Sequence, residues 1–332
     1  MKIILSKSNF APENLAGEEY LFKNFTDDIF YLYINNPSII VGRKQNTLAE
    51  INYDYIKEHN IPVVRRMSGG GAVFHDSGNL NFCFIMRNQN NIENDFSKYT
   101  LPIIEVLQSL GINAQLEGRN DLTINGKKFS GNAKYFSNKT LLQHGTILFT
   151  SKLSDLSQAL TADQDKFNDK AVKSVQSRVT NISNHLKQEL SLESFTDLLI
   201  KHITLTFKDE NSDEPAQFYE FNSNDVNCIS KLVIDKYNNW DWNFGNSPEY
   251  NYNKKIRTIG GSLQAAMIVK KGIIQDLKFY GDFFSKKDID SFEKYFINTT
   301  HDHKSIQNIL IKYKPEDYFF NISKDDILNV LF

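Results

Sequence analysis

The chain has 332 residues, more than one hydrophobic core usually serves, so two domains are expected. Its 40% apolar content supplies packed cores, while a mean hydropathy of −0.43 and the lack of an 18-residue apolar run exclude a membrane-spanning helix. A net charge of −2 gives no overall field that would attract nucleic acid or an anionic membrane, so neither is an expected partner.

The first part of the chain predicts mixed helix and strand. Leu15, Glu19 and Phe22 have helical spacing within a helix over residues 9–24. Further along, the pattern predicts a hairpin of strands 30–34 and 38–41, a short helix over 49–59, and strands over 61–66 and 80–86. The apolar start, Met-Lys-Ile-Ile-Leu, is too short for a signal peptide. Both cysteines, Cys83 and Cys228, lie in apolar periodic segments that predict buried free thiols, as suits a cytoplasmic enzyme.

Residues 65–76 read Arg-Arg-Met-Ser-Gly-Gly-Gly-Ala-Val-Phe-His-Asp. Three consecutive glycines cost backbone entropy on folding, so their presence indicates a backbone that lies close to a ligand or adopts dihedrals that a Cβ forbids. Arginines beside exposed backbone N–H groups point to an anion, either a phosphate or a carboxylate. A plain flexible loop is the alternative, because neither the Lys-Ser/Thr of a Walker A motif nor a G-x-G-x-x-G spacing is present.

A second polar cluster spans residues 118–134. Its Asn125-Gly126 pair predicts a type I′ hairpin between strand 121–124 and a strand that starts at Lys127. Regular alternation would place Lys128 on one face with Ser130 and Asn132, and Lys127 on the other with Phe129 and Gly131. A solvated hairpin edge protected by lysines is the alternative.

The remaining pattern predicts a helix over 96–110 that ends at Gly111, a strand over 140–150 and a helix over 192–207. A polar, proline-containing break follows at 246–254. After it come a hairpin of strands 262–269 and 273–280, and helices, one opened by a capping-box-like Ser323. Short turns and irregularly placed helices favour an α+β fold with a largely antiparallel mixed sheet flanked by helices.

The two polar clusters together resemble the signature of lipoate–protein ligases, in the biotin/lipoate ligase superfamily. The glycine block resembles the family's glycine-rich loop, and Gly118-Arg119-Asn120-Asp121 with Lys128-Phe129-Ser130-Gly131 resembles its lysine motif. Further matching blocks follow in family order at residues 143–146, 174–181 and 240–245. The resemblance implies a catalytic domain over 1–246 and a small α+β accessory domain over 254–332.

This resemblance implies an enzyme that activates lipoate with ATP and Mg²⁺, releases pyrophosphate, and transfers the lipoyl group from lipoyl-AMP to a lysine of a carrier. The expected carriers are the glycine cleavage H protein and E2 lipoyl domains. Lys128 is the expected catalytic residue, and Asp121 the expected metal ligand. Expected contacts to ATP or lipoyl-AMP are Arg66, Ser68, Gly69, Gly70, Gly71, Ala72, Val73, Phe74, Asn120, Asp121 and Lys128; expected contacts to lipoate are Lys128, Ser130, Gly131, His75 and His144.

Three alternatives stay open at this point. An octanoyl or lipoyl transferase would use no ATP and would need a nucleophilic cysteine, but neither Cys83 nor Cys228 has a polar, activating sequence context. A non-enzymatic carrier-binding protein would leave the glycine and lysine motifs without a purpose. A biotin–protein ligase is a more distant alternative, because its glycine- and arginine-rich loop differs.

Overall fold

The structure is a computed structural model that describes residues 1–89, 95–118, 120–160, 179–207, 217–246 and 250–332. Arg119 and residues 174–178, which carry parts of the family-like motifs, lie outside the described residues. Two compact units are present: the first combines Met1–Arg43, Ile56–Leu160 and Lys173–Asn239, and the second contains Lys44–Tyr55 and Trp240–Phe332. The domain boundary expected at 246–254 stays a prediction.

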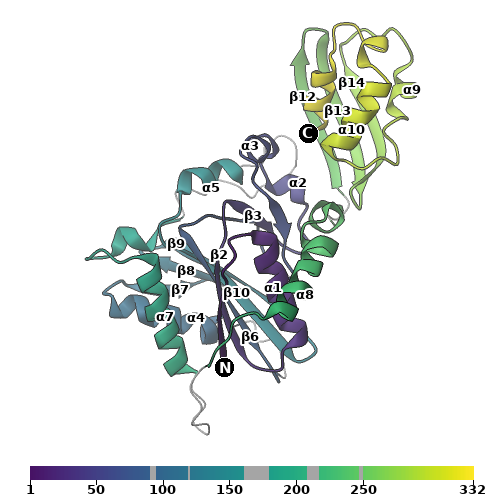
Figure 1. Cartoon of the computed structure of the whole chain (residues 1–332). Helices are drawn as coiled ribbons and strands as arrows, with labels where there is room; N and C mark the ends of the chain where they lie inside the picture. The colour runs from purple at the N-terminus through teal and green to yellow at the C-terminus, as the bar shows by residue number, and fades with distance from the viewer. Residues whose placement is uncertain (90–94, 119, 161–178, 208–216, 247–249) are drawn as a thin grey trace. The chain divides into compact units, whose positions relative to one another are not determined.

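An eight-stranded mixed sheet forms the centre of the first unit (Figure 1). Strand β1 pairs in parallel with β2 and β11, and every other neighbouring pair in this sheet is antiparallel. The α+β class with a largely antiparallel sheet is therefore confirmed. In spatial order the strands are β11 (Gln217–Phe218), β1 (Lys2–Leu5), β2 (Ile29–Ile34), β6 (Asn79–Met86), β10 (Thr140–Leu148), β9 (Lys127–Ser137), β8 (Asp121–Ile124) and β7 (Ala114–Glu117).

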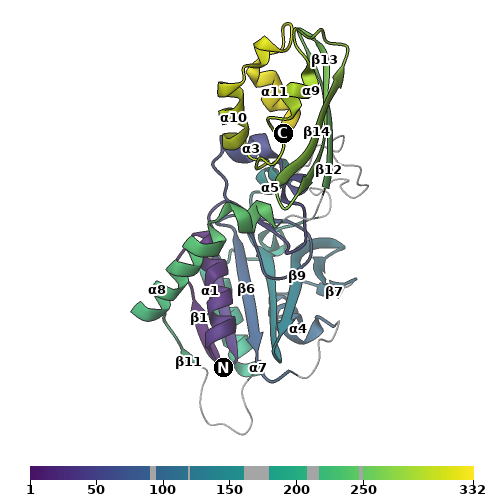
Figure 2. The ribbon, with the colours of Figure 1, turned by 90° about the vertical axis from the view of Figure 1, so that its right-hand side faces the viewer.

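Helices cover both faces of this sheet (Figure 2). On one face, α4 (Ser97–Ser109) and α7 (Leu192–Thr206) pack their apolar stripes against alternate side chains of the central strands. On the other face lies α1 (Ala11–Asn24), against which α8 (Ser223–Leu232) packs. The sheet is thus buried on both sides, which holds its strand ends in fixed positions for a site.

A second, three-stranded sheet in this unit has the order β4 (Val63–Arg65), β3 (Ser38–Val41) and β5 (Val73–His75). The predicted hairpin of residues 30–34 and 38–41 is wrong, because β3 leaves the large sheet and pairs in parallel with β4 and antiparallel with β5. Strand β5, within the glycine block, was absent from the sequence prediction. The predicted helix over 49–59 is two helices, α2 (Thr47–Glu50) and α3 (Tyr53–Glu58).

The first unit also contains the short helix α5 (Leu153–Ala159), the 3-10 helix η1 (Ile182–His185) and the π-helix η2 (Val233–Tyr237). None of the helices within the described ranges is long and apolar enough to cross a membrane.

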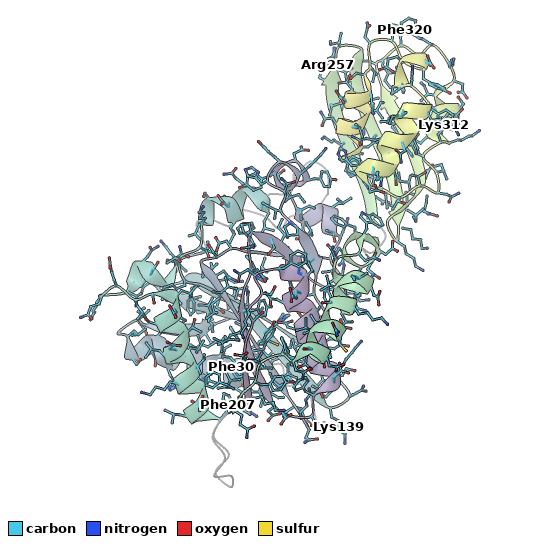
Figure 3. All side chains as sticks on the ribbon, viewed as in Figure 1. Phe30, Lys139, Phe207, Arg257, Lys312 and Phe320 are labelled. Carbon is cyan, nitrogen blue, oxygen red and sulfur yellow. The ribbon has the colours of Figure 1, made fainter. Side chains whose placement is uncertain are left out.

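The second unit contains an antiparallel sheet of β12 (Tyr250–Thr258), β13 (Gly261–Lys270) and β14 (Ile273–Gly281). The predicted hairpin over 262–280 is confirmed, with positive φ angles at Lys271 and Gly272. Its core lies between the sheet and the helices α9 (Ile289–Glu293), α10 (His303–Lys312) and α11 (Lys324–Leu331), and the predicted capping box at Ser323 is present. This unit also contains the π-helix η3 (Asp241–Gly245) and the 3-10 helix η4 (Pro315–Asp317). Figure 3 shows Phe30 inside the first unit and Phe320 at the surface of the second, 0% and 48% exposed.

Candidate functional site

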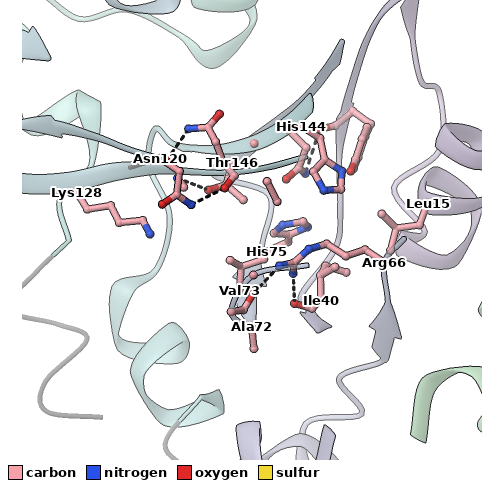
Figure 4. Close-up of a pocket in the computed structure, with 18 residues that line it drawn as sticks. Leu15, Ile40, Arg66, Ala72, Val73, His75, Asn120, Lys128, His144 and Thr146 are labelled. Carbon is pink, nitrogen blue, oxygen red and sulfur yellow. Dashed lines mark hydrogen bonds between the residues drawn. The ribbon is translucent and has the colours of Figure 1, made fainter. Parts of the chain in front are cut away.

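The two polar segments singled out in the sequence face each other across one cleft of about 580 Å³. One wall comes from β9 and β10, and the other from β3, β5 and the loop between β4 and β5 (Figure 4). This inner cleft is lined by Leu15, Tyr33, Ile40, Arg66, Gly70, Gly71, Ala72, Val73, His75, Asn81, Asn120, Lys128, Gly131, Asn132, Ala133, His144, Gly145 and Thr146.

Arg66 holds the glycine loop in shape. Its Nη2 donates to the carbonyl oxygens of Gly69 (2.6 Å) and Gly71 (2.8 Å), its Nη1 donates to the Ile40 carbonyl (3.1 Å), and its Nε donates to Ser68 Oγ (3.0 Å). Four of the five N–H donors of a guanidinium are therefore engaged by the protein. Burial lowers the pKa of Arg66 to about 10, which still leaves it charged at neutral pH. The neighbouring Arg65 is fully buried and donates to the Gly42 and Arg43 carbonyls.

The three glycines of the loop differ in what the protein requires of them. Gly70 has φ +91°, and a Cβ there would come within 3.0 Å of Arg66 Nη2. At Gly69 and Gly71 a Cβ would meet no heavy atom within 4 Å, and neither residue has φ in the left-handed region. The backbone conformation therefore explains why residue 70 is glycine. It does not explain why residues 69 and 71 are also glycine.

A buried hydrogen-bond chain fastens the loop to the large sheet and to α1. Ser68 Oγ lies 2.6 Å from His144 Nε2, and His144 Nδ1 lies 2.8 Å from Glu18 Oε2. Tyr33 donates its hydroxyl to Glu18 Oε1 at 3.0 Å. Glu18 and Tyr33 were not predicted as site residues from the sequence. The acidic pair Glu18-Glu19 inside an apolar helical stretch could have indicated a buried polar group there.

Lys128 lies at the mouth of the cleft, with Nζ 2.8 Å from Asp121 Oδ1. The predicted strand alternation is wrong here, because β9 contains a β-bulge. Lys128 pairs with Thr123 of β8 and Ser130 pairs with Leu122, so Phe129 between them is an extra residue without a partner in the register. The Lys128 side chain consequently lies over Gly131, where an added Cβ would come within 2.8 Å of Nζ. Lysine 128 thus shares a face with Gly131, and Phe129 is buried in the core instead.

A second, outer cleft of about 1200 Å³ adjoins the first. Four residues line both clefts: Ala72, Val73, Lys128 and Thr146. The residues that belong only to the outer cleft include Phe74 and the two carboxylates Glu117 and Asp121. Lys128 therefore occupies the junction of the two clefts, whereas its neighbour Lys127 is exposed and lines neither.

Ser68, Gly69 and Ser130 are the predicted site residues that line neither cleft. Ser130 is buried and its Oγ accepts from Asn132 Nδ2 at 3.3 Å. Asn120 donates from Nδ2 to the Asn132 carbonyl at 2.6 Å, which fixes the loop before β8 against β9. Within the described part of the chain no three His, Cys, Asp or Glu side chains cluster as a metal site.

The cysteine environments bear on nucleophilic chemistry. Cys83 is fully buried among apolar side chains, and burial raises the pKa of its thiol well above the usual value. Cys228 is exposed on α8, so the predicted burial of this residue is wrong. The apolar spacing around it arises because Ile229, not Cys228, turns inward. Neither cysteine lines either cleft, so no thiolate is available there as an acyl carrier.

Comparisons with known proteins agree over the whole chain. Residues 11–204 match the family model of the lipoyl protein ligase A/B catalytic domain, and residues 247–331 match that of the bacterial lipoate protein ligase C-terminus. A lipoate–protein ligase of Bacillus subtilis (strain 168) is 40% identical over 321 residues, which cover 96% of each chain. Lipoate–protein ligase 1 of Staphylococcus aureus (strain Mu50 / ATCC 700699) is 40% identical over 334 residues and covers 100% of each.

Two solved structures share the fold. The bi-partite lipoate protein ligase from Thermoplasma acidophilum, described with its E2 lipoyl domain, has 27% identity and a TM-score of 0.64 over 74% of this chain and 96% of its own. P. falciparum LipL1, in complex with lipoate, has 26% identity and a TM-score of 0.62 over 100% of both chains. With both family models matched in order and two relatives aligned end to end, this chain belongs to the lipoate–protein ligase family.

Proposed function

We propose that this protein activates lipoate with ATP to lipoyl-AMP and pyrophosphate, and then transfers the lipoyl group to a lysine of a carrier protein. The observation that carries the proposal is the position of Lys128, at the junction between a narrow inner cleft and a wider outer cleft. A carboxylate entering from one side and a phosphate from the other would meet at its Nζ.

The chemistry explains why a cation is needed at this point. Attack of a carboxylate on the α-phosphate brings two anions together, at a cost of roughly 4 kcal/mol for unit charges about 4 Å apart at an effective dielectric constant near 20. An ammonium group held between them offsets this repulsion and stabilises the charge of the transition state. Asp121, 2.8 Å from Nζ, orients the ammonium in the free protein.

We assign the acyl chain to the inner cleft and the nucleotide to the outer one. Leu15, Ile40 and Val73 supply apolar walls to the inner cleft, where each buried methylene of a fatty tail contributes about 0.8 kcal/mol. The P. falciparum relative in complex with lipoate supports lipoate as the acid. The outer cleft combines apolar Leu148 and Leu156 with the glycine-loop residues Ala72 to Phe74, a surface suited to an adenosine group.

Arg66 serves this site through the loop that it holds. Because its donors are engaged by loop carbonyls, it sets the positions of Gly69 to Gly71, of which Gly70 and Gly71 line the inner cleft. The open space beside Gly69 and Gly71 fits a ligand that approaches the bare backbone. The hydrogen bond between Ser68 and His144 attaches the same loop to β10.

Mg²⁺ fits the outer cleft as a companion of ATP. Asp121 offers one carboxylate there, and Mg²⁺ commonly takes one or two carboxylates with the remaining ligands from phosphate and water. When bound, the ion would neutralise phosphate charge.

The proposed carriers are lipoyl domains of E2 enzymes and the glycine cleavage H protein. The description of the T. acidophilum relative with its E2 lipoyl domain supports the first. A cytoplasmic location is proposed as well, and the two free thiols suit such a reducing compartment.

Mass spectrometry of a carrier domain incubated with enzyme, lipoate, ATP and Mg²⁺ tests the proposal. The carrier should gain the mass of one lipoyl group only when every component is present. Omission of the carrier should still allow lipoate-dependent exchange of pyrophosphate into ATP. A mass gain that needs no ATP, or that proceeds from an acylated donor protein alone, would overturn the proposal in favour of a transferase.

A further inference from the structure

The proposed reaction gives no role to Glu117, a carboxylate of the outer cleft. Glu117 is the last residue of β7, and it lines the outer cleft but not the inner one. It directly precedes the motif that starts at Gly118, and it was not predicted as a site residue from the sequence. A carboxylate beside a bound nucleotide has a limited set of groups that it can contact favourably.

The register of the edge strands turns Glu117 toward the cleft. Strands β7 and β8 pair regularly, and Leu116 lies opposite Leu122. Both leucines face the core, because Leu122 is fully buried and Leu116 packs against the same cluster. Successive residues of a strand point to opposite faces, so the next pair, Glu117 and Asp121, points away from the core. Both residues accordingly line the outer cleft.

The Glu117 carboxylate is oriented but can still accept hydrogen bonds. Gln115, on the same face of β7, donates from Nε2 to Glu117 Oε1 at 2.6 Å. Among the residues that the structure describes, Oε2 takes part in no hydrogen bond or ion pair. Asp121 differs, because its Oδ1 lies 2.8 Å from Lys128 Nζ. A carboxylate has about four acceptor positions, so Glu117 has capacity for a ligand with hydroxyl donors.

The position of Glu117 along the nucleotide follows from Lys128. In the proposed reaction the α-phosphate lies at Lys128 Nζ, beside Asp121. Glu117 is opposite Asp121 on the next strand outward, at about 5 Å for a cross-strand pair. The α-phosphate is bonded to the ribose on one side and to the β-phosphate on the other. These are the two nucleotide groups that a side chain in this position can reach.

The charge of the carboxylate favours the ribose. A β-phosphate next to Glu117 would bring two anions together, with the same kind of Coulomb cost as the approach of lipoate to the α-phosphate. The ribose instead offers two hydroxyl donors, and hydrogen bonds from hydroxyl groups to a carboxylate are short and strong. Dinucleotide-binding folds use an acidic side chain in this way to bind a ribose hydroxyl.

We propose that Glu117 accepts hydrogen bonds from the 2′- and 3′-hydroxyls of the ribose and so makes the enzyme select a ribonucleotide. This inference rests on the proposed function. A nucleotide without these hydroxyls leaves the carboxylate without its ligand partners. Because Glu117 is half-buried, water still reaches it, so discrimination should stay below that of a fully buried polar site. We expect kcat/KM to favour ATP over 2′,3′-dideoxy-ATP by about tenfold.

The test compares ATP with 2′,3′-dideoxy-ATP in lipoate-dependent pyrophosphate exchange at saturating Mg²⁺. In Glu117→Ala, kcat/KM should fall about tenfold for ATP and stay unchanged for the dideoxy nucleotide, so the ratio approaches 1. Glu117→Gln keeps an oxygen that accepts hydrogen bonds and should keep part of the preference. Glu105→Ala is the matched control, the same change at a carboxylate of α4 that lines neither cleft, and it should behave as wild type.

A nucleotide preference that survives in Glu117→Ala, or equal losses for both nucleotides, would overturn the inference. Equal losses together with a higher Mg²⁺ requirement would assign Glu117 to the metal instead. Calorimetric binding of each nucleotide to the folded variants gives the same comparison where turnover is low. The two proposals also fail separately. If wild type exchanges no pyrophosphate with lipoate and ATP, the proposed function is wrong. If wild type is active but uses both nucleotides equally, only the role of Glu117 is wrong.

Discussion

Replacing single glycines by alanine separates what the fold needs from what the ligand needs. At Gly71 an added Cβ meets no atom within 4 Å and φ is not left-handed, so Gly71→Ala should change the free energy of unfolding by no more than about 0.5 kcal/mol. At Gly70, φ +91° and the 3.0 Å approach to Arg66 Nη2 make alanine strained, at a cost of about 1–2 kcal/mol. This cost corresponds to a melting temperature lower by about 2–8 °C.

Activity should follow a different order. Gly71 lines the inner cleft, so a methyl group there occupies space next to the substrate and should lower kcat/KM for pyrophosphate exchange at least about tenfold, roughly 1.4 kcal/mol of transition-state binding. Gly111→Ala is the matched control, because Gly111 has φ +78° but follows α4 and lines neither cleft. It should lower the melting temperature and leave kcat/KM unchanged.

The assays are thermal unfolding followed by circular dichroism, and lipoate-dependent pyrophosphate exchange at a temperature where all variants are folded. A Gly71→Ala enzyme with full activity and native stability would refute the reasoning, since nothing would then require a glycine at that position. A Gly71→Ala enzyme that unfolds would show instead that the loop is more crowded than its geometry indicates.

Three further predictions concern other parts of the molecule. Cys228→Ser should leave carrier lipoylation unchanged, because this cysteine is exposed and lines neither cleft. Cys83→Ala should lower the melting temperature but should not lower carrier lipoylation at about 25 °C, where the variant is folded. Loss of lipoylation in a folded variant would instead indicate a thiol intermediate. Burial lowers the pKa of His301 to about 4, whereas in the unfolded chain the imidazole takes up a proton near pH 6.5. The contribution of the buried neutral ring to the free energy of unfolding should therefore be complete above pH 6.5. It should fall as the pH drops toward 4, by up to about 1.4 kcal/mol per pH unit. Thermal unfolding of His301→Gln across this range should show a shallower dependence, and an equal slope would contradict the assignment. Asp121→Asn should raise the Mg²⁺ concentration needed for half-maximal pyrophosphate exchange, because one anionic oxygen of the outer cleft is lost; an unchanged Mg²⁺ dependence would remove Asp121 as a ligand.

Local chemistry made much of the fold predictable from sequence. The Asn125-Gly126 pair adopts positive φ at both residues, as a type I′ turn requires, and β8 and β9 start and end around it as expected. Helix α4 ends just before Gly111, whose φ of +78° follows the C-cap. In each case one residue type is nearly the only one that the backbone accepts.

Features decided by tertiary packing were not predictable in the same way. The extra residue Phe129 in β9 follows from the core taking that side chain at 0% exposure, and no local signal marks it. Similarly, β3 leaves the large sheet because β4 and β5 offer partners that lie far along the chain. The role of Glu18 was not predictable, because its hydrogen-bond partners, His144 and Tyr33, lie on strands distant in sequence.

Lys128 lines both clefts, and we propose that its ammonium group offsets the repulsion between the lipoate carboxylate and the α-phosphate. Its neighbour Lys127 is the matched control, since it is exposed on the same strand and lines neither cleft. Lipoate-dependent pyrophosphate release by Lys128→Ala should fall by at least roughly 10²–10³, whereas Lys127→Ala should keep nearly full activity. Comparable activity of the two variants, or an inactive Lys127→Ala beside an active Lys128→Ala, would contradict the account.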